Sequence, residues 1–139
     1  MTYEALTNND SFVYEGHFTN DATWDIPKKF KEHGYQINMI FLGLENPDIS
    51  ELRVINRTNE GVHFVPRRTV EDNYFGNLEK LNLYFGNIDE LKIIDTSETE
   101  HLLLATFSKG EVVSSIPISD LPIWFIKYLP KLVEKIKIK

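Results

Sequence analysis

Residues 74–83 read YFGNLEKLNL, and residues 84–93 repeat that pattern as YFGNIDELKI. A repeat every ten residues fits one β-strand and one turn. Gly-Asn is a favoured hairpin dipeptide, because glycine and asparagine both tolerate positive φ. The repeat therefore predicts neighbouring strands of an antiparallel meander.

A helix over residues 70–84 is the alternative interpretation of the same segment. Thr69 can cap such a helix at its N-terminus. The apolar residues follow the spacing of one helical face: Val70, Tyr74, Leu78 and Leu81. Gly76 would then lie in mid-helix, where glycine costs about 1 kcal/mol relative to alanine. The sequence leaves both interpretations open.

Alternating or continuous apolar patterns flank the repeat on both sides. They predict strands at residues 11–18, 36–44, 51–57, 62–68, 101–107 and 111–118. Residues 36–44 end in a continuous apolar run, so we expect a central strand that is buried on both faces. Lys109 and Gly110 lie at the turn of the last predicted hairpin.

Two helices are predicted outside the strands. Asp25 and Pro27 suit the start of a short helix, and Gly34 can supply its left-handed end. A C-terminal helix opens near Pro122, and Pro130 should kink or split it. We therefore expect one α+β domain over residues 1–139, with an antiparallel sheet of about six to eight strands and the C-terminal helix on one face.

Composition supports a folded domain and excludes several kinds of site. The chain has 139 residues, of which 42% are hydrophobic and 12% aromatic, close to globular averages. The absence of cysteine excludes disulfides, thiolate metal sites and cysteine nucleophiles, and favours a reducing compartment. The first ten residues lack a signal-peptide pattern, and no long apolar run follows. We expect a cytoplasmic protein without a membrane span.

The net charge of −6 argues against non-specific binding of nucleic acids, which requires a cationic surface. It suits a basic partner protein or simple solubility. No phosphate-binding loop, nucleophile elbow or metalloprotease pattern is present. We therefore predict no cofactor and no catalytic residue.

The histidines give no metal-binding spacing. His17, His33, His63 and His101 are far apart in the chain, so we predict no metal site. Glu15 and His17 lie two residues apart on a predicted strand and would face the same side. An acid–base pair is one interpretation of that spacing, and two exposed strand residues are the commoner one.

The arginines all lie on one predicted hairpin, formed by residues 51–57 and 62–68. An odd loop length would place a cationic set on its outer face beside Glu51: Arg53, Arg57, His63 and Arg67. Guanidinium groups bind carboxylates and phosphates in bidentate fashion, so this set is a candidate site for an anion or a partner. A solvated sheet face with Glu51 opposite Arg67 is the alternative.

Residues 89–100 form the densest acidic stretch of the chain. Its candidate residues for binding a basic partner are Asp89, Glu90, Asp95, Glu98 and Glu100. The first hypothesis is therefore a non-enzymatic protein-binding module, such as a small acidic inhibitor or immunity-type protein that occludes a basic enzyme. The second is a small-ligand or anion-binding domain that uses the arginine-rich hairpin, either as a binding protein or as an enzyme. A homo-oligomer that pairs through exposed strand edges is a further option.

Overall fold

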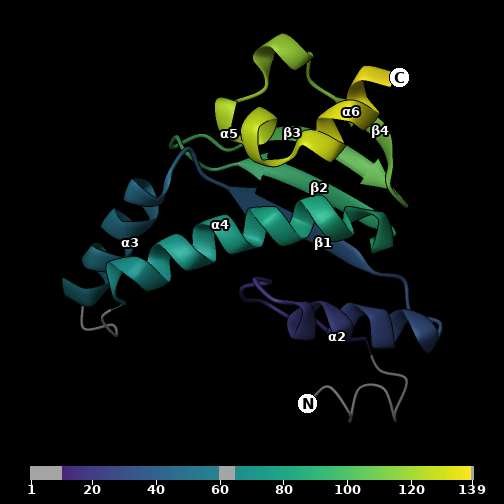
Figure 1. The fold of residues 1–139 in the computed structure, drawn as a ribbon, viewed down its shortest axis with the longest axis horizontal. Coiled ribbons are helices and arrows are strands. Elements are labelled where there is room, and N and C mark those ends of the chain that lie inside the picture. Colours follow the sequence, from purple (N-terminus) through teal and green to yellow (C-terminus); the bar gives the residue numbers. More distant parts are fainter. Residues whose placement is uncertain (1–10, 60–64, 139) are drawn as a thin grey trace.

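The structure, a computed structural model, describes residues 11–59 and 65–138 and is α+β (Figure 1). Within those residues the helices are α2 (Asp21–Glu32), α3 (Pro47–Asn59), α4 (Arg67–Tyr84), α5 (Ile123–Tyr128) and α6 (Pro130–Ile138). The strands are β1 (Asn38–Gly43), β2 (Glu90–Asp95), β3 (Leu102–Ser108) and β4 (Glu111–Ser115). The α+β class is confirmed. The predicted antiparallel sheet of six to eight strands is wrong, because the described strands form one mixed sheet of four.

The sheet has the order β1-β2-β3-β4. β1 runs parallel to β2, with Gly43 opposite Asp95 at their carboxyl ends. The other two neighbouring pairs are antiparallel. Parallel neighbours require a crossover connection, and here α3 and α4 provide it. The carboxyl ends of β1 and β2 therefore lie side by side, and the chain enters α3 soon after β1 ends.

Helices α4, α5 and α6 lie on the same face of the sheet (Figure 1). The largest fully buried side chains lie between these helices and the strands: Leu81, Ile88, Leu91, Ile93, Leu104, Phe107, Phe125, Leu129 and Leu132. The predicted split of the C-terminal helix is confirmed, since α5 ends at Tyr128 and α6 begins at Pro130.

The predicted hairpin around Lys109 and Gly110 is confirmed as β3 and β4. Lys109 has φ 50° and Gly110 has φ 82°, so both turn residues are left-handed. Two consecutive residues with positive φ match the twist of the flanking strands and favour a tight hairpin.

β1 confirms the predicted strand but not its predicted place at the centre of the sheet. It lies at the edge, paired with β2. Ile40 is 64% exposed and Leu42 is 59% exposed, on the face opposite α4. An apolar run indicates that a strand can be buried on both faces, but tertiary packing decides whether a helix covers the second face.

The predicted strands near residues 51–57 and 62–68 are wrong in the described part of the chain. Residues 51–57 belong to α3, whereas residues 60–64 lie outside the described residues. The side chain of Asn46 accepts hydrogen bonds from the backbone N–H groups of Asp48 (3.0 Å) and Ile49 (3.3 Å). Asn46-Pro47 therefore starts a helix instead of closing a turn between strands.

The meander predicted from the repeat is also wrong for its first copy, and the helical alternative is confirmed. Residues 74–83 lie in α4, whose buried residues are those of the predicted apolar face. Close packing explains why residue 76 of this helix is glycine: a Cβ built there would lie 2.9 Å from Cβ of Thr19. The second copy forms a short 3₁₀ turn and then β2. The repeated Tyr-Phe-Gly-Asn sequence thus adopts different structures in its two copies, because the tertiary contacts of the copies differ.

The first predicted strand, residues 11–18, is wrong, because these residues join no sheet. Phe18 is instead fixed by two contacts. Its N–H donates to Oδ1 of Asn77 on α4 (2.7 Å), and its carbonyl accepts from Nε1 of Trp24 on α2 (3.1 Å). The helix predicted next is confirmed as α2, although Asn20, not Asp25, caps it. Gly34, with φ 85°, follows its end as expected.

Candidate functional site

A cavity of about 260 Å³ opens at the carboxyl end of β1, where α3 and α4 approach the strand. Its apolar wall comes from Phe41, Leu44, Val65, Val70 and Leu78. Its polar side chains are His17, Ser50, Arg53, Asn73, Tyr74 and Asn77. Its volume of about 260 Å³ is just below the roughly 300–1,000 Å³ that is common for pockets of drug-sized ligands, so the cavity suits a smaller molecule. In open sheets with parallel strands, ligands bind beyond the carboxyl ends of those strands. This cavity lies at the carboxyl end of a parallel strand, β1.

Gly43 and Thr96 shape the end of the sheet beside the cavity. The carbonyl of Gly43 accepts from the backbone N–H of Thr96 (2.8 Å) and from its hydroxyl (3.0 Å). A Cβ built on Gly43 would lie 2.2 Å from Cη2 of Trp124. The strand backbone can therefore pack directly on the indole ring only because the residue is glycine.

Arg53 brings a positive charge from α3 to this end of the sheet. Its Nη2 donates to the carbonyl of Thr96 (2.7 Å), and its Nη1 lies 3.5 Å from the hydroxyl of the same residue. A guanidinium has five N–H donors, so two contacts with Thr96 do not exhaust its capacity. Among the described residues that line the cavity, none is an aspartate or glutamate. Arg53 therefore offers an anion in the cavity a guanidinium partner, whereas the carboxylates of Asp95 and Glu45 lie near Tyr74 without lining the cavity.

Tyr74 fixes the loop that follows β1. Its hydroxyl donates to the carbonyl of Leu44 (2.7 Å). Burial raises the pKa of Tyr74, and the nearby Tyr128, Asp95 and Glu45 raise it further. The phenol therefore stays protonated over the physiological range and acts as a permanent donor to the loop.

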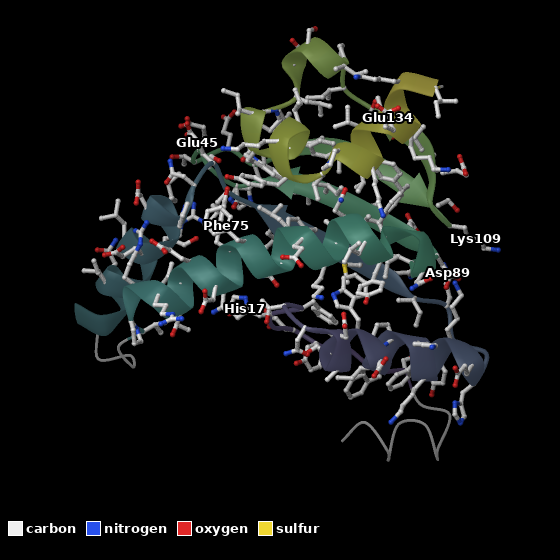
Figure 2. The ribbon with its side chains drawn as sticks, viewed as in Figure 1. His17, Glu45, Phe75, Asp89, Lys109 and Glu134 are labelled. Atoms are coloured by element: carbon white, nitrogen blue, oxygen red, sulfur yellow. The ribbon has the colours of Figure 1, made fainter. Side chains whose placement is uncertain are left out.

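Asn73 and Asn77 reach the cavity from successive turns of α4, and His17 reaches it from the segment before α2. Figure 2 shows His17 alongside α4. Nδ1 of His17 lies 3.0 Å from the amide nitrogen of Asn77. The cavity thus combines polar groups that lie up to 60 positions apart in the chain.

No protein-family model, curated protein or solved structure matches this chain. The function must therefore be inferred from the site itself. In residues 11–59 and 65–138, no three histidine, aspartate or glutamate side chains are grouped so that they could hold a metal ion. Over the same residues, every helix is too short or too polar to cross a lipid bilayer.

The structure does not assemble the predicted arginine hairpin. Arg53 lies on α3 and lines the cavity, and Arg67 lies on the first turn of α4. Arg57 belongs to α3, and nothing is described of its side chain, while His63 lies outside the described residues. The anion-binding prediction is retained for Arg53, which lines the cavity among the members of the set whose side chains the structure describes.

Arg67 is held by three carboxylates. Its guanidinium contacts Asp48 (2.9 Å) and Glu71 (2.8 Å), and it also pairs with Glu51. The hydrogen bonds that Arg67 donates to Glu71 and, next in size of effect, to Glu51 raise the pKa of Arg67. Glu51 and Arg67 were expected to face each other across two strands, and the structure places them together across two helices. Because Asp48 and Glu51 lie on α3 and Arg67 lies on α4, these ion pairs link the two helices.

The predicted acidic residues do not form one surface. Asp89 accepts from the backbone N–H of Ile37 (2.7 Å) and pairs with Lys31 (3.5 Å), near the start of β2. Glu90 is the first residue of β2. Asp95 accepts from the N–H (3.0 Å) and the hydroxyl (2.7 Å) of Ser97 at the opposite end of the strand.

Glu98 and Glu100 are exposed in the connection between β2 and β3. They are the two exposed members of the acidic set, whereas Asp89, Glu90 and Asp95 are partly buried. The role predicted for the set, binding of a basic partner, stays a prediction.

Sequence reasoning missed Ser50, Asn73 and Asn77 as cavity residues. The signal for the two asparagines was available in the helical alternative, because residues four apart lie on the same helical face. The sequence carries no comparable signal for Ser50, because the place of Ser50 in the cavity depends on how α3 packs against β1.

Proposed function

We propose that this chain binds a small organic anion in the cavity at the carboxyl end of β1. The observation that carries the proposal is the pairing of Arg53 with an apolar wall in one cavity. An anionic head group can pair with the guanidinium, and an apolar body can occupy the remaining space. The absence of carboxylates among the described lining residues supports this assignment.

Thermal-shift measurements with inorganic phosphate, acetate and benzoate test the proposal. A ligand that binds the native state raises Tm by mass action, and a hundredfold excess over Kd stabilises by about 2.7 kcal/mol. We expect benzoate to raise Tm more than acetate does at equal concentration and ionic strength, because its ring can contact the apolar wall. Equal effects of the two carboxylates would contradict an organic anion.

Arg53→Gln and Arg68→Gln form a matched pair for this experiment. Arg68 is an exposed residue of α4 that does not line the cavity. We expect the response to benzoate to persist in Arg68→Gln and to be lost in Arg53→Gln. A response that is the same in both variants would show that the anion binds elsewhere and would overturn the proposal.

A second proposal concerns the acidic loop, and the exposure of Glu98 and Glu100 favours it. These carboxylates can attract a basic protein surface and set the rate of encounter. We rank it below anion binding because Asp89 and Asp95 are engaged in local contacts. Native pull-downs with the wild type and with Glu98→Lys/Glu100→Lys test it: partners captured equally by both would contradict a role for the loop.

A further inference from the structure

The side-chain amide of Asn77 has one possible orientation. The backbone N–H of Phe18 donates to its Oδ1 at 2.7 Å, and an N–H group requires an oxygen acceptor. The oxygen of the amide therefore faces Phe18, and its nitrogen, Nδ2, faces the other way. Asn77 links α4 to a segment 59 positions earlier in the chain.

Nδ2 of Asn77 lies 3.0 Å from Nδ1 of His17. An amide nitrogen can only donate, so Nδ1 of the imidazole must accept. A neutral imidazole that accepts at Nδ1 carries its proton on Nε2. The contacts of one asparagine thus select one of the two neutral tautomers of His17.

The segment that carries His17 is anchored although the imidazole itself is exposed. Phe18 is held through its N–H by Asn77 and through its carbonyl by Trp24, whose indole nitrogen lies 3.1 Å away. The Phe18 ring also packs edge-on against Trp24, with ring centroids 5.5 Å apart. Thr19 approaches Gly76 of α4 closely. His17 is therefore presented to the cavity by a preorganised backbone.

We infer that His17, held in its Nε2–H form by Asn77, is a specificity-determining residue that donates a hydrogen bond to the anion bound by Arg53. This inference rests on the proposed function and adds a requirement to it. The ligand must offer an acceptor oxygen to the imidazole as well as a negative charge to the guanidinium. Carboxylate and phosphate groups both meet this requirement, because each has several acceptor oxygens.

The tautomer is measured by long-range ¹H–¹⁵N correlation spectra of the full chain, at a pH where the imidazoles are neutral. His17→Gln assigns the His17 signals among the four histidines. We expect the Nε2–H pattern in the wild type and the reversed, Nδ1–H pattern in Asn77→Asp. Aspartate is nearly isosteric, it still accepts from Phe18, and it can only accept from the imidazole. An Nδ1–H pattern in the wild type would overturn the inference.

Binding of benzoate and inorganic phosphate is then compared in the wild type, His17→Gln and His17→Leu. A hydrogen bond to a charged group contributes roughly 1.5–3 kcal/mol, which corresponds to about a tenfold to hundredfold change in Kd. We expect a loss of that size for His17→Leu, and a Kd within a few-fold of the wild type for His17→Gln, whose amide supplies a donor near the position of Nε2. Each variant's Tm without ligand shows that it is folded.

The outcomes separate the inference from the proposed function. If benzoate or phosphate binds the wild type and His17→Leu equally, the role of His17 is overturned while anion binding stands. If neither probe raises the Tm of the wild type, the proposed function and the ligand role of His17 are both overturned. If both probes bind and His17→Leu alone weakens them, the inference is supported.

Discussion

The sheet side of the molecule and its α3–α4 end are held together by different interactions. On the sheet side, side chains such as Phe107 and Phe125 are fully buried among apolar neighbours. At the other end, α3 meets α4 through Arg67 and its carboxylates, and α3 meets the sheet through the contact of Arg53 with Thr96. The candidate cavity lies at this second end.

The difference indicates a division of roles. Close apolar packing is costly to disturb, because removing atoms leaves a void that the surroundings fill only in part. Exposed ion pairs contribute little each and weaken in salt. We therefore expect the sheet side to set global stability, and the α3–α4 end to tolerate the small adjustments that ligand binding requires.

The largest expected effect is on the sheet side, in Phe125→Ala. Phe125 is 0% exposed, and removing a buried phenylalanine side chain costs about 3–5 kcal/mol. Urea denaturation should show this loss in the free energy of unfolding. Ile126→Ala is the matched control on the same helix, since Ile126 is 43% exposed. Similar losses in the two variants would contradict the assignment of the core face.

The next effect is expected for Gly43→Ala, at the boundary between the two regions. The added methyl group would overlap the indole of Trp124, and overpacking of this kind costs about 1–3 kcal/mol. Gly86→Ala is the control, because a Cβ there meets no atom within 4 Å. Thermal unfolding should show a lower Tm for Gly43→Ala than for Gly86→Ala. The reverse order would mean that β1 does not pack on Trp124 as described.

A smaller effect is expected at the α3–α4 end, in Arg67→Met. The variant keeps an apolar stem but leaves Asp48, Glu51 and Glu71 without their shared cation. We expect a modest fall in Tm at low ionic strength that shrinks at high salt, because salt screens exposed pairs. Arg68→Met, on the same turn of α4, should change little. A Tm difference independent of salt would show that Arg67 acts through packing.

The smallest expected effect concerns pH and the contact between α2 and α4. Asp21 accepts from the hydroxyl of Tyr84 (2.6 Å) and pairs with Lys80 (3.0 Å). The hydrogen bond from Tyr84, followed by that from Lys80, lowers the pKa of Asp21. Its folded pKa thus lies below its unfolded pKa, so the contact stabilises above the unfolded pKa and is lost as pH falls through the folded pKa.

Asp21→Asn tests this linkage. We expect the wild type to melt above the variant at neutral pH, and the difference to vanish in acid once Asp21 is protonated. Glu32→Gln, an exposed carboxylate at the other end of the same helix, is the control. A difference that persists in acid would contradict the ionic origin of the contact.

Local patterns predicted some elements well. The hairpin at Lys109-Gly110 needs two left-handed residues, and the break at Pro130 follows from its missing N–H, so neighbours in the sequence suffice for both. The meander predicted from the repeat at residues 74–93 was wrong for the first copy, because Gly-Asn permits a hairpin without requiring one. The close approach of Thr19 to Gly76 favours the helix, and that contact joins residues 57 positions apart.

The candidate site was predictable only in its components. His17 and Arg53 were both identified from the sequence, but as members of different sets on strands that do not form. That His17 and Arg53 line one cavity with Asn73 and Asn77 depends on the crossover from β1 through α3 and α4 to β2. No spacing along the chain encodes that path.

The α+β class, the hairpin and the split C-terminal helix follow from the order of residues along the chain, because hydrophobic period, proline and left-handed turn residues act over a few positions. The tertiary structure alone decided that β1 lies at the edge, that Arg67 is neutralised between two helices, and that Arg53 and His17 line one cavity. These features depend on contacts between distant residues, whose free energies are set by burial and charge in the folded state.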